Sequence, residues 1–188
     1  MSKPLRHPML RGLVLALALA VAANAGAEFS VAEVQTRDNG GMLSMDAQID
    51  YGFSEDALEA LDNGVPLILE VHVQLRDADA WIWDESLVDQ RLRYAIRYKP
   101  LSERYLVSQL PGDGGTSYVT RDAAIAALGE IEDLQLVSAD RLDPDHEYEI
   151  QIKAALDIEE LPLPLKPIAY LLPSWKLSSG WTKWRLEH

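Results

Sequence analysis

The sequence predicts a mainly β fold, an antiparallel β-sandwich that includes two short helices. Three segments alternate apolar and polar side chains with a period of two, as strands with one buried face do. The tetrapeptide DNGG, residues 38–41, lies between two further strand-like segments and is typical of a hairpin turn. The sequence lacks the long helical segments that connect parallel strands, so the antiparallel arrangement is favoured.

The first expected strands are residues 29–37 and 42–51, which the DNGG turn joins into a hairpin. In VPLILEVHVQLR, residues 65–76, the alternate positions from Leu67 to Leu75 are apolar and form one face. The same alternation predicts that QRLRYAIRYK and EYEIQIKAAL turn these side chains inward: Leu92, Tyr94, Ile96, Tyr98, Tyr148, Ile150, Ile152, Ala154 and Leu156. Weaker strands are expected at residues 103–110, 116–119 and 174–186.

Two helices are expected from their capping residues. Ser54 precedes EDALEAL as an N-cap, and Gly64 lies beyond the end of that segment. Thr120 or Asp122 caps AAIAAL, which ends before Gly129. The proline-rich segment LPLPLKP, residues 161–167, is expected to be a connector that runs extended or turns, because proline cannot continue regular hydrogen bonding.

One local pattern narrows the sandwich to an immunoglobulin-like type. In LDPDHEYEIQI, Leu142, Pro144 and Tyr148 precede an alternating strand with the spacing of a tyrosine corner. In such a corner the tyrosine hydroxyl bonds to backbone a few residues upstream, and this fixes how the chain crosses between the sheets. The alternative is a proline turn followed by an ordinary strand with one inward tyrosine.

The amino terminus has the layout of a secretory signal peptide, residues 1–27. Three basic residues precede an apolar run from Leu13 to Ala23, which is shorter than the roughly 20 residues that a membrane-spanning helix needs. Small residues follow, and they predict cleavage after Ala25 or Ala27. An uncleaved anchor is the alternative. Residues 28–188 are then expected to form a single domain in the periplasm.

The chain is strongly acidic and has no cysteine. Removing residues 1–27 takes away three of 17 basic residues, which leaves 14 against 30 acidic residues and a formal charge of −16. Such a chain repels phosphate backbones and anionic lipid head groups, so nucleic-acid binding is not expected. No second apolar run follows the first, so insertion into the membrane after cleavage is not expected either. Without cysteine the exported chain forms no disulfide and carries no lipid on a cysteine.

The residues of hydrolytic or metal chemistry are sparse, and no cofactor is expected. His72 lies on the polar face of an expected strand, where a solvated or cross-strand role is favoured over a general base. The acidic segments 129–134 and 143–147 lack the spacing of known calcium loops and are interpreted as solvated turns. Two carboxylates that cleave a glycan could lie far apart in the sequence, so this possibility stays open.

Four basic side chains share one face of the expected strand 90–99. Arg91, Arg93, Arg97 and Lys99 lie opposite its apolar residues and raise the local positive potential. They either pair with outward acids such as Glu147 and Glu149 on another strand, or bind an acidic protein segment or an anionic ligand.

Five tryptophans complete the pattern. Trp81 and Trp83 share a face if their segment is extended, and they fill the core or form an exposed patch for a protein or a sugar. The other three suggest that the last strand packs aromatic side chains into the core or covers its open edge: Trp175, Trp181 and Trp184.

Four segments, in order, resemble the DUF4390 family of exported proteobacterial proteins: DNGVPLILEVHVQLR, WIWDE, YAIRYKPLSERYLV and AYLLPSWKLSSGWTKWRL. The resemblance covers nearly the whole of residues 28–188. It implies export and a small single domain, suggests a link to envelope signalling, and transfers no active site.

The sequence therefore predicts a periplasmic, non-enzymatic binding or accessory module whose partner is another envelope protein. The candidate partner-binding residues are Trp81, Trp83, Arg91, Arg93, Arg97 and Lys99. Two rival hypotheses are an envelope glycan hydrolase that uses two carboxylates, and a chaperone-like role through an open sheet edge.

Overall fold

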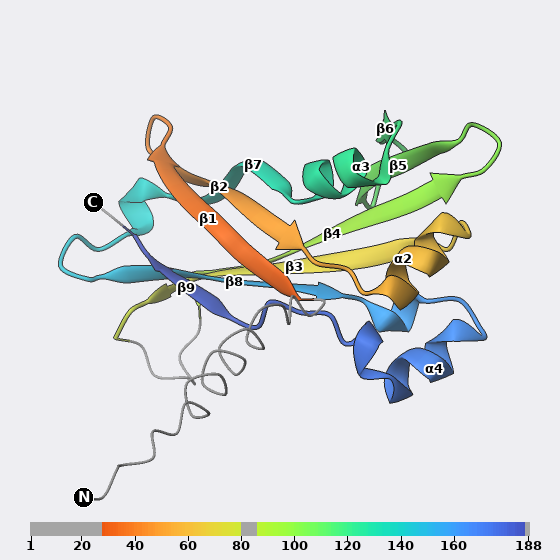
Figure 1. The fold of residues 1–188 in the computed structure, drawn as a ribbon. Helices are drawn as coiled ribbons and strands as arrows, with labels where there is room; N and C mark the ends of the chain where they lie inside the picture. The colour runs from red at the N-terminus through yellow and green to blue at the C-terminus, as the bar shows by residue number, and fades with distance from the viewer. Residues whose placement is uncertain (1–27, 80–85, 187–188) are drawn as a thin grey trace, which may run out of the picture.

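The computed structural model describes residues 28–79 and 86–186, which form two antiparallel sheets packed face to face (Figure 1). The three-stranded sheet has the order β1-β2-β7, with bounds Phe29–Asp38, Met42–Tyr51 and Glu130–Ser138. The six-stranded sheet has the order β6-β5-β4-β3-β8-β9, with bounds Thr116–Tyr118, Arg104–Leu110, Val88–Lys99, Leu67–Asp77, Tyr148–Leu156 and Thr182–Arg185. The expected mainly β sandwich is confirmed.

The strand order is that of an immunoglobulin-like sandwich. In the usual lettering, β1, β2 and β7 take the places of strands A, B and E. Strands β9, β8, β3 and β4 take the places of G, F, C and C′ in the second sheet. The tyrosine corner is also present, because the Tyr148 hydroxyl accepts a hydrogen bond of 3.0 Å from the backbone N–H of Asp143.

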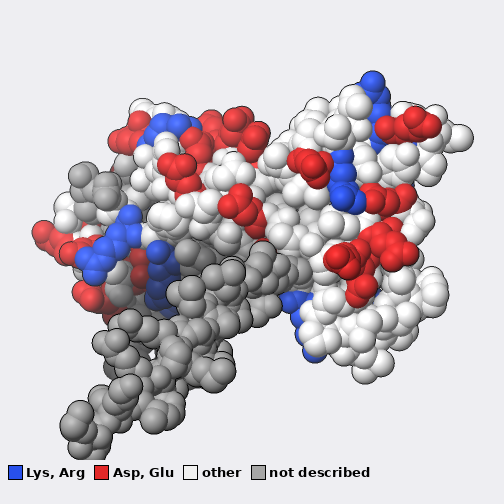
Figure 2. Space-filling model, in the orientation of Figure 1, with Lys and Arg blue, Asp and Glu red and all other residues white. Residues whose placement is uncertain are grey.

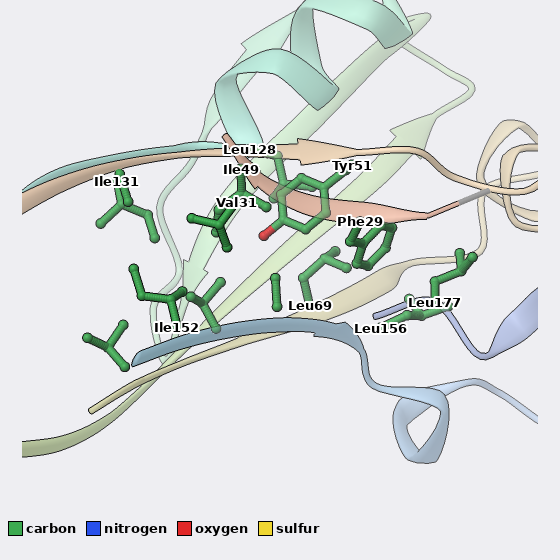
Figure 3. Close-up of a cluster of buried hydrophobic side chains, with 14 of the residues drawn as sticks. Phe29, Val31, Ile49, Tyr51, Leu69, Leu128, Ile131, Ile152, Leu156 and Leu177 are labelled. Atoms are coloured by element: carbon green, nitrogen blue, oxygen red, sulfur yellow. The ribbon is translucent and has the colours of Figure 1, made fainter. Parts of the chain in front are cut away.

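The core lies between the sheets and follows the alternation of the sequence (Figure 3). The alternate side chains of β3 are fully buried from Leu67 to Leu75, and those of β8 from Tyr148 to Leu156 are buried or nearly so. Phe29, Tyr51 and Phe53 form an aromatic cluster where the three-stranded sheet meets this core, with ring centroids 4.8–5.9 Å apart. Burial of the Tyr51 hydroxyl raises its pKa.

The two expected helices are confirmed, and a third is present. Helix α2, Glu55–Asp62, and helix α3, Arg121–Leu128, begin after Ser54 and Thr120, whose side chains accept hydrogen bonds from backbone N–H groups. Helix α4, Leu165–Leu171, begins inside the segment that was expected to be a connector. Proline is tolerated in the first turn of a helix, where its missing N–H is not needed, and Pro167 is in that turn.

Two other sequence predictions were wrong. The acidic segment 129–134, interpreted as a turn, is mostly part of β7, which pairs with β2. Of the expected strand 174–186, only β9 is formed, because residues 173–175 make a short 3-10 helix, η3, and a loop follows it. Two further 3-10 turns are η1, Ala139–Arg141, and η2, Ile158–Glu160.

The carboxylate of Asp62 joins three elements at one end of the sandwich. It accepts hydrogen bonds from the Tyr105 hydroxyl of β5, at 2.8 Å, and from the guanidinium of Arg121 at the start of α3. Burial and this hydrogen bond raise the pKa of Tyr105 to about 12. The helices are thereby fixed over the ends of the strands. Within the two described ranges, no helix is long and apolar enough to cross a membrane.

Candidate functional site

The four basic residues of β4 lie on the outer face of the six-stranded sheet. The register pairs Leu67 with Ile96 and Val71 with Leu92, and all four side chains face the core. The alternate residues of both strands, which include the four basic residues, therefore face outward. We call the set formed by these basic residues and their outward neighbours the outer β3–β4 face: Glu70, His72, Gln74, Asp89, Arg91, Arg93, Arg97, Lys99 and Trp181.

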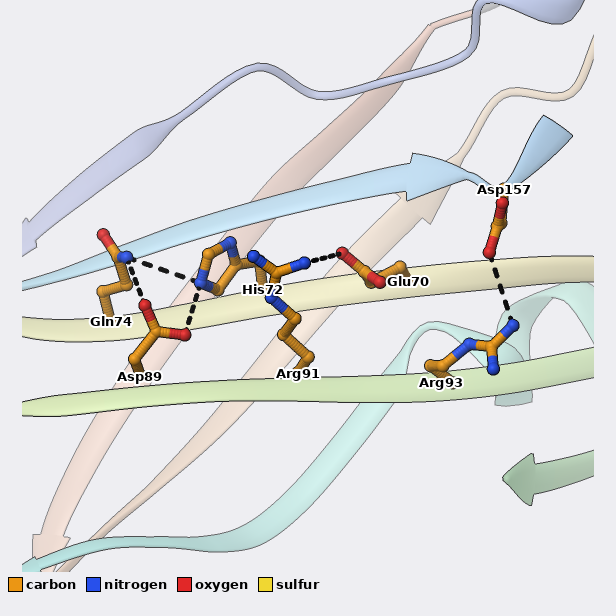
Figure 4. Close-up of polar contacts among 7 residues, drawn as sticks. All are labelled: Glu70, His72, Gln74, Asp89, Arg91, Arg93 and Asp157. Atoms are coloured by element: carbon orange, nitrogen blue, oxygen red, sulfur yellow. Dashed lines mark hydrogen bonds and ion pairs between the residues drawn. The ribbon is translucent and has the colours of Figure 1, made fainter. Parts of the chain in front are cut away.

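A hydrogen-bonded network occupies one half of this face (Figure 4). The imidazole Nε2 of His72 lies 2.8 Å from one carboxylate oxygen of Asp89, and the amide of Gln74 donates to the other at 2.7 Å. The hydrogen bond from Gln74, together with that from His72, lowers the pKa of Asp89. His72 is a cross-strand residue and is not solvated, because its side chain is only 13% exposed.

Arg91 and Arg93 have acidic partners, but not the expected ones. A guanidinium nitrogen of Arg91 lies 3.6 Å from a carboxylate oxygen of Glu70 on the adjacent strand β3. Arg93 lies 2.7 Å from Glu160 and 3.3 Å from Asp157, at the turn η2 after β8, and its pKa is raised mainly by the hydrogen bond to Glu160. These contacts hold both guanidinium groups on the surface of the sheet (Figure 4).

The acids that the sequence suggested as partners belong to another pair of strands. Glu149 of β8 bonds to Lys183 of β9 at 2.8 Å, and Glu147 lies 3.3 Å from Arg185. Strand β9, which supplies Lys183 and Arg185, pairs with β8 at the edge of the six-stranded sheet. The prediction that Arg91 and Arg93 form ion pairs with acidic residues of other segments was therefore correct, but the predicted partners were wrong. The partners depend on the order of the strands in the sheet, which the sequence of one strand does not indicate.

Arg97 and Lys99 form the other half of the outer β3–β4 face. Both are exposed, and neither forms an ion pair with any residue that the structure describes. Their register partners on β5 are Leu106 and Arg104, which offer no negative charge. These two cations remain available to an anionic ligand.

Trp181 is a member of the face that sequence reasoning missed. Its ring lies 4.9 Å from that of His72, measured between centroids and tilted, and the residue is 44% exposed. Trp175 is buried and Trp184 packs half-buried against the core, so two of the three carboxyl-terminal tryptophans follow the prediction and Trp181 does not. Trp181 precedes β9, which begins at Thr182, so the alternation of a strand does not indicate which face Trp181 joins.

Trp81 and Trp83 lie outside the described residues, in the segment 80–85 that connects β3 and β4. The prediction that they fill the core or form a recognition patch stays a prediction. The described residues next to that segment are at the end of the six-stranded sheet that carries Asp77 and Val88.

The opposite surface of the sandwich is acidic. A hollow of about 310 Å³ on the outer face of the three-stranded sheet is lined by eight residues: Glu33, Gln35, Asp46, Ala47, Gln48, Glu130, Ile131 and Glu132. Arg37 forms an ion pair with Asp46 at its border. Among the described residues, no group of three or more His, Asp or Glu side chains is placed to hold a metal ion.

The chemistry of the outer β3–β4 face suits binding. The His72–Asp89 pair has the form of a base and its orienting acid, but within the described chain no hydroxyl group hydrogen-bonds to His72 as a nucleophile would. What the face presents is fixed cations, a hydrogen-bonded polar network and an exposed indole. Arginine and tryptophan are the residues that contribute most at protein interfaces.

Comparison with known proteins gives one match. A family model described as a domain of unknown function, DUF4390, matches residues 26–185. No curated protein and no solved structure matches the chain.

Proposed function

Because the chain belongs to the DUF4390 family, whose function is unknown, we propose a function from its surface chemistry. The protein is a non-enzymatic binding module of the periplasm that holds another envelope protein on its outer β3–β4 face. The observation that carries this proposal is the row of four cations on β4, two of which have no acidic partner among the described residues.

An acidic segment of a partner protein fits this row. Arg91 and Arg93 are two positions apart on one strand, as are Arg97 and Lys99, so the cations of each pair are spaced roughly 7 Å along the strand, like alternate side chains of an extended acidic peptide. Ala95 separates the two pairs. The planar guanidinium groups of Arg91 and Arg93 are already fixed by Glu70, Asp157 and Glu160, so little side-chain entropy is lost when a carboxylate binds beside them. Trp181 supplies an apolar contact next to the charged row.

The overall negative charge of the protein makes the row of four cations on β4 more selective for an acidic partner. An acidic partner is repelled by most of the surface and attracted only where cations gather. Binding through this face is therefore expected to weaken as salt rises, because exposed charges are screened beyond about 10 Å at 0.1 M salt.

Affinity capture from native periplasm and solubilised envelope tests the proposal. The wild type is compared with Arg97→Glu/Lys99→Glu, whose side chains make no ion pair with described residues, and with Arg91→Glu/Arg93→Glu. The matched control is Arg37→Glu/Arg141→Glu, which reverses two exposed cations away from this face. Thermal melts establish that each variant folds.

Three outcomes are informative. A protein retained by the wild type and the control, and lost by a folded β4 variant, supports the proposal and locates the surface. Trp81→Ala/Trp83→Ala, made in parallel, shows whether the segment next to β4 takes part. If all folded variants retain the same proteins as a blank resin, the binding-module proposal is wrong and the two-carboxylate hydrolase is the next hypothesis to test, beginning with release of sugar from peptidoglycan.

A further inference from the structure

Two cations face each other directly at the end of the hairpin that β4 and β5 form. The register pairs Lys99 with Arg104, and this is the last pair before the connecting turn, residues 100–103. Directly opposed side chains on antiparallel strands have Cβ atoms about 5 Å apart, so two like charges there repel each other and destabilise the hairpin. Positions that oppose stability in this way are expected where a protein has a function.

Arg97 completes a set of three cations, which we call the hairpin triad: Arg97, Lys99 and Arg104. Arg97 lies two positions before Lys99 on the same outer face, roughly 7 Å away along the strand, and diagonally across from Arg104. All three residues are exposed, and none forms an ion pair with a residue in the ranges 28–79 and 86–186. Glu103, in the adjoining turn, forms no ion pair with them either. The described structure therefore offers the hairpin triad no counter-charge.

The hairpin triad contrasts with many other basic residues of this acidic chain. Figure 2 shows acidic side chains in several groups over one face of the molecule, with basic side chains next to several of them. Arg37, Arg121 and Lys183, for example, each form an ion pair with a carboxylate. The chain has 30 acidic against 17 basic residues, so acidic partners are abundant. The positive charge of the hairpin triad is thus left open to a ligand from outside.

The turn holds the opposed cations in place. The backbone N–H of Ser102 donates to the carbonyl oxygen of Lys99 at 3.2 Å, and Pro100 restricts φ at the first central position of this turn. Leu101, at the tip, is completely exposed. Because the backbone on both sides of the turn is fixed, less conformational entropy is lost when a ligand binds across the strands.

We propose that the hairpin triad is the anchor at which two carboxylates of an acidic, extended protein segment bind. One carboxylate lies between Lys99 and Arg104, and a second, two residues along the segment, lies at Arg97. The planar guanidinium of arginine holds a carboxylate through two parallel hydrogen bonds. Leu101 offers a neighbouring apolar contact that a protein segment can use and a small inorganic anion cannot.

This inference rests on the proposed function and narrows its surface to one end of the outer β3–β4 face. Arg91 and Arg93 already have acidic partners, so their positive charge is partly neutralised and their contact with the partner is secondary. Arg104 of β5 joins the site instead. The partner segment is expected to need two carboxylates separated by one residue, because alternate side chains of an extended chain lie on one side, roughly 7 Å apart.

Stability and binding should respond to substitution in opposite directions. Lys99→Glu replaces a repulsive cross-strand pair by an attractive one, so the melting temperature of the free protein should rise by about 1–3 °C although binding is lost. Arg141→Glu is the matched control, because it changes the net charge equally at an exposed cation of η1 that has no ion pair with the described residues. It should leave peptide binding unchanged.

Binding is measured at low salt by nuclear magnetic resonance, through the backbone amides of the purified protein. The probe is a short blocked peptide in which one threonine separates two glutamates, and a second peptide of the same composition has the glutamates adjacent. The first should shift the amides of residues 97–104 and bind at least about threefold more tightly than the second. Lys99→Glu and Arg104→Glu should each weaken its binding at least about tenfold, and Arg141→Glu should not.

Three results would overturn the inference while the proposed function stands. Equal binding of both peptides would indicate general attraction to positive charge. Inorganic phosphate that shifts the same amides more strongly than the peptide does would assign the hairpin triad to a phosphoryl ligand. In the capture experiment, Arg104→Glu that retains a partner lost by Arg91→Glu/Arg93→Glu would place the anchor elsewhere on the face. A capture in which no β4 variant loses a partner would overturn the proposed function and this inference together.

Discussion

The domain consists of two regions whose exposed side chains differ in charge and polarity. Residues 28–160 carry 29 acidic and ten basic residues, and their exposed side chains are mostly charged. Residues 161–186 carry four basic and no acidic residues, and they expose leucine, isoleucine and tyrosine. The exposed surface of the first region is thus largely charged, whereas the second exposes apolar side chains of the kind that is typical of contact sites.

Both regions nevertheless contribute to one core. The carboxyl-terminal segment buries one side completely, with Leu161, Ala169, Trp175, Leu177 and Leu186 among the core residues. It is also held by backbone hydrogen bonds, since Leu156 donates to Leu177 and Ser179 donates to Ala154. The exposed apolar residues are therefore on the outer side of a well-anchored segment and are not the sign of a loose one.

The largest predicted effect compares two tryptophans of the second region. Trp175→Ala should lower the free energy of unfolding by about 3–5 kcal/mol, because a ring that is only 3% exposed leaves a cavity. Trp181→Ala should cost less than about 1 kcal/mol, because this ring is partly exposed and loses mainly its contact with His72. Urea denaturation of both variants measures the difference. Equal losses would mean that Trp181 is as important to the fold as Trp175.

The second prediction concerns the tyrosine corner in the acidic region. Tyr148→Phe should lower the free energy of unfolding by about 1 kcal/mol, because the N–H of Asp143 loses its acceptor. Tyr98→Phe is the matched control, since its half-buried ring lies tilted against that of Tyr105 and its hydroxyl has no hydrogen bond to the described residues. Chemical denaturation is the measurement. If the two variants lose the same stability, the corner contributes nothing beyond its ring.

The fold of the first region could be read from the sequence to a large extent because its strands are buried on one side. Alternation placed β3, β4 and β8 within two residues of their observed bounds, and the turn at Gly40 and Gly41 placed the first hairpin. Strand β7 was missed because it is irregular: its register with β2 shifts twice, so its apolar residues do not alternate. Asp133 has a positive φ of 48° within it.

The second region could not be read in the same way. Prolines at 162, 164 and 167 indicated a break in structure, but α4 begins at Leu165 and includes Pro167 in its first turn, where proline is tolerated. For the outer β3–β4 face, the common orientation of Arg91, Arg93, Arg97 and Lys99 followed from periodicity, but their partners depend on strand order. Trp181 lies in a loop, where no period indicates which face a residue joins.

The third prediction tests the joint between the two regions. The hydroxyl of Ser174, in η3, donates to the carboxylate of Asp56, in α2. Ser174→Ala should lower the free energy of unfolding by only about 0.5 kcal/mol, because Asp56 is exposed and water replaces the lost donor. Ser102→Ala is the control, since that exposed hydroxyl makes a long bond of 3.4 Å to a backbone oxygen. Amide exchange in α4 that is unchanged in Ser174→Ala would show that this joint does not hold the helix.

The smallest effect is expected where the acidic region pairs its charges at the surface. His146 and Asp77 form an exposed ion pair between the corner loop and the end of β3. The hydrogen bond between them raises the pKa of His146 above 6.5 and lowers that of Asp77 below 3.8. The pair therefore stabilises the fold most between pH 3.8 and pH 6.5, where Asp77 is ionised and His146 is protonated. Its contribution is lost as pH falls through the lowered pKa of Asp77, and also as pH rises through the raised pKa of His146.

His146→Gln isolates this contribution. The melting temperature of the variant should lie slightly below that of the wild type at roughly pH 5, and the two should converge above the raised pKa of His146, where the imidazole is neutral in both states. The carboxyl-terminal region offers a contrast, because none of its residues up to position 186 is an acid or a histidine that titrates in this range. A difference that persisted at roughly pH 9 would mean that the imidazole packs against the corner and does not act through its charge.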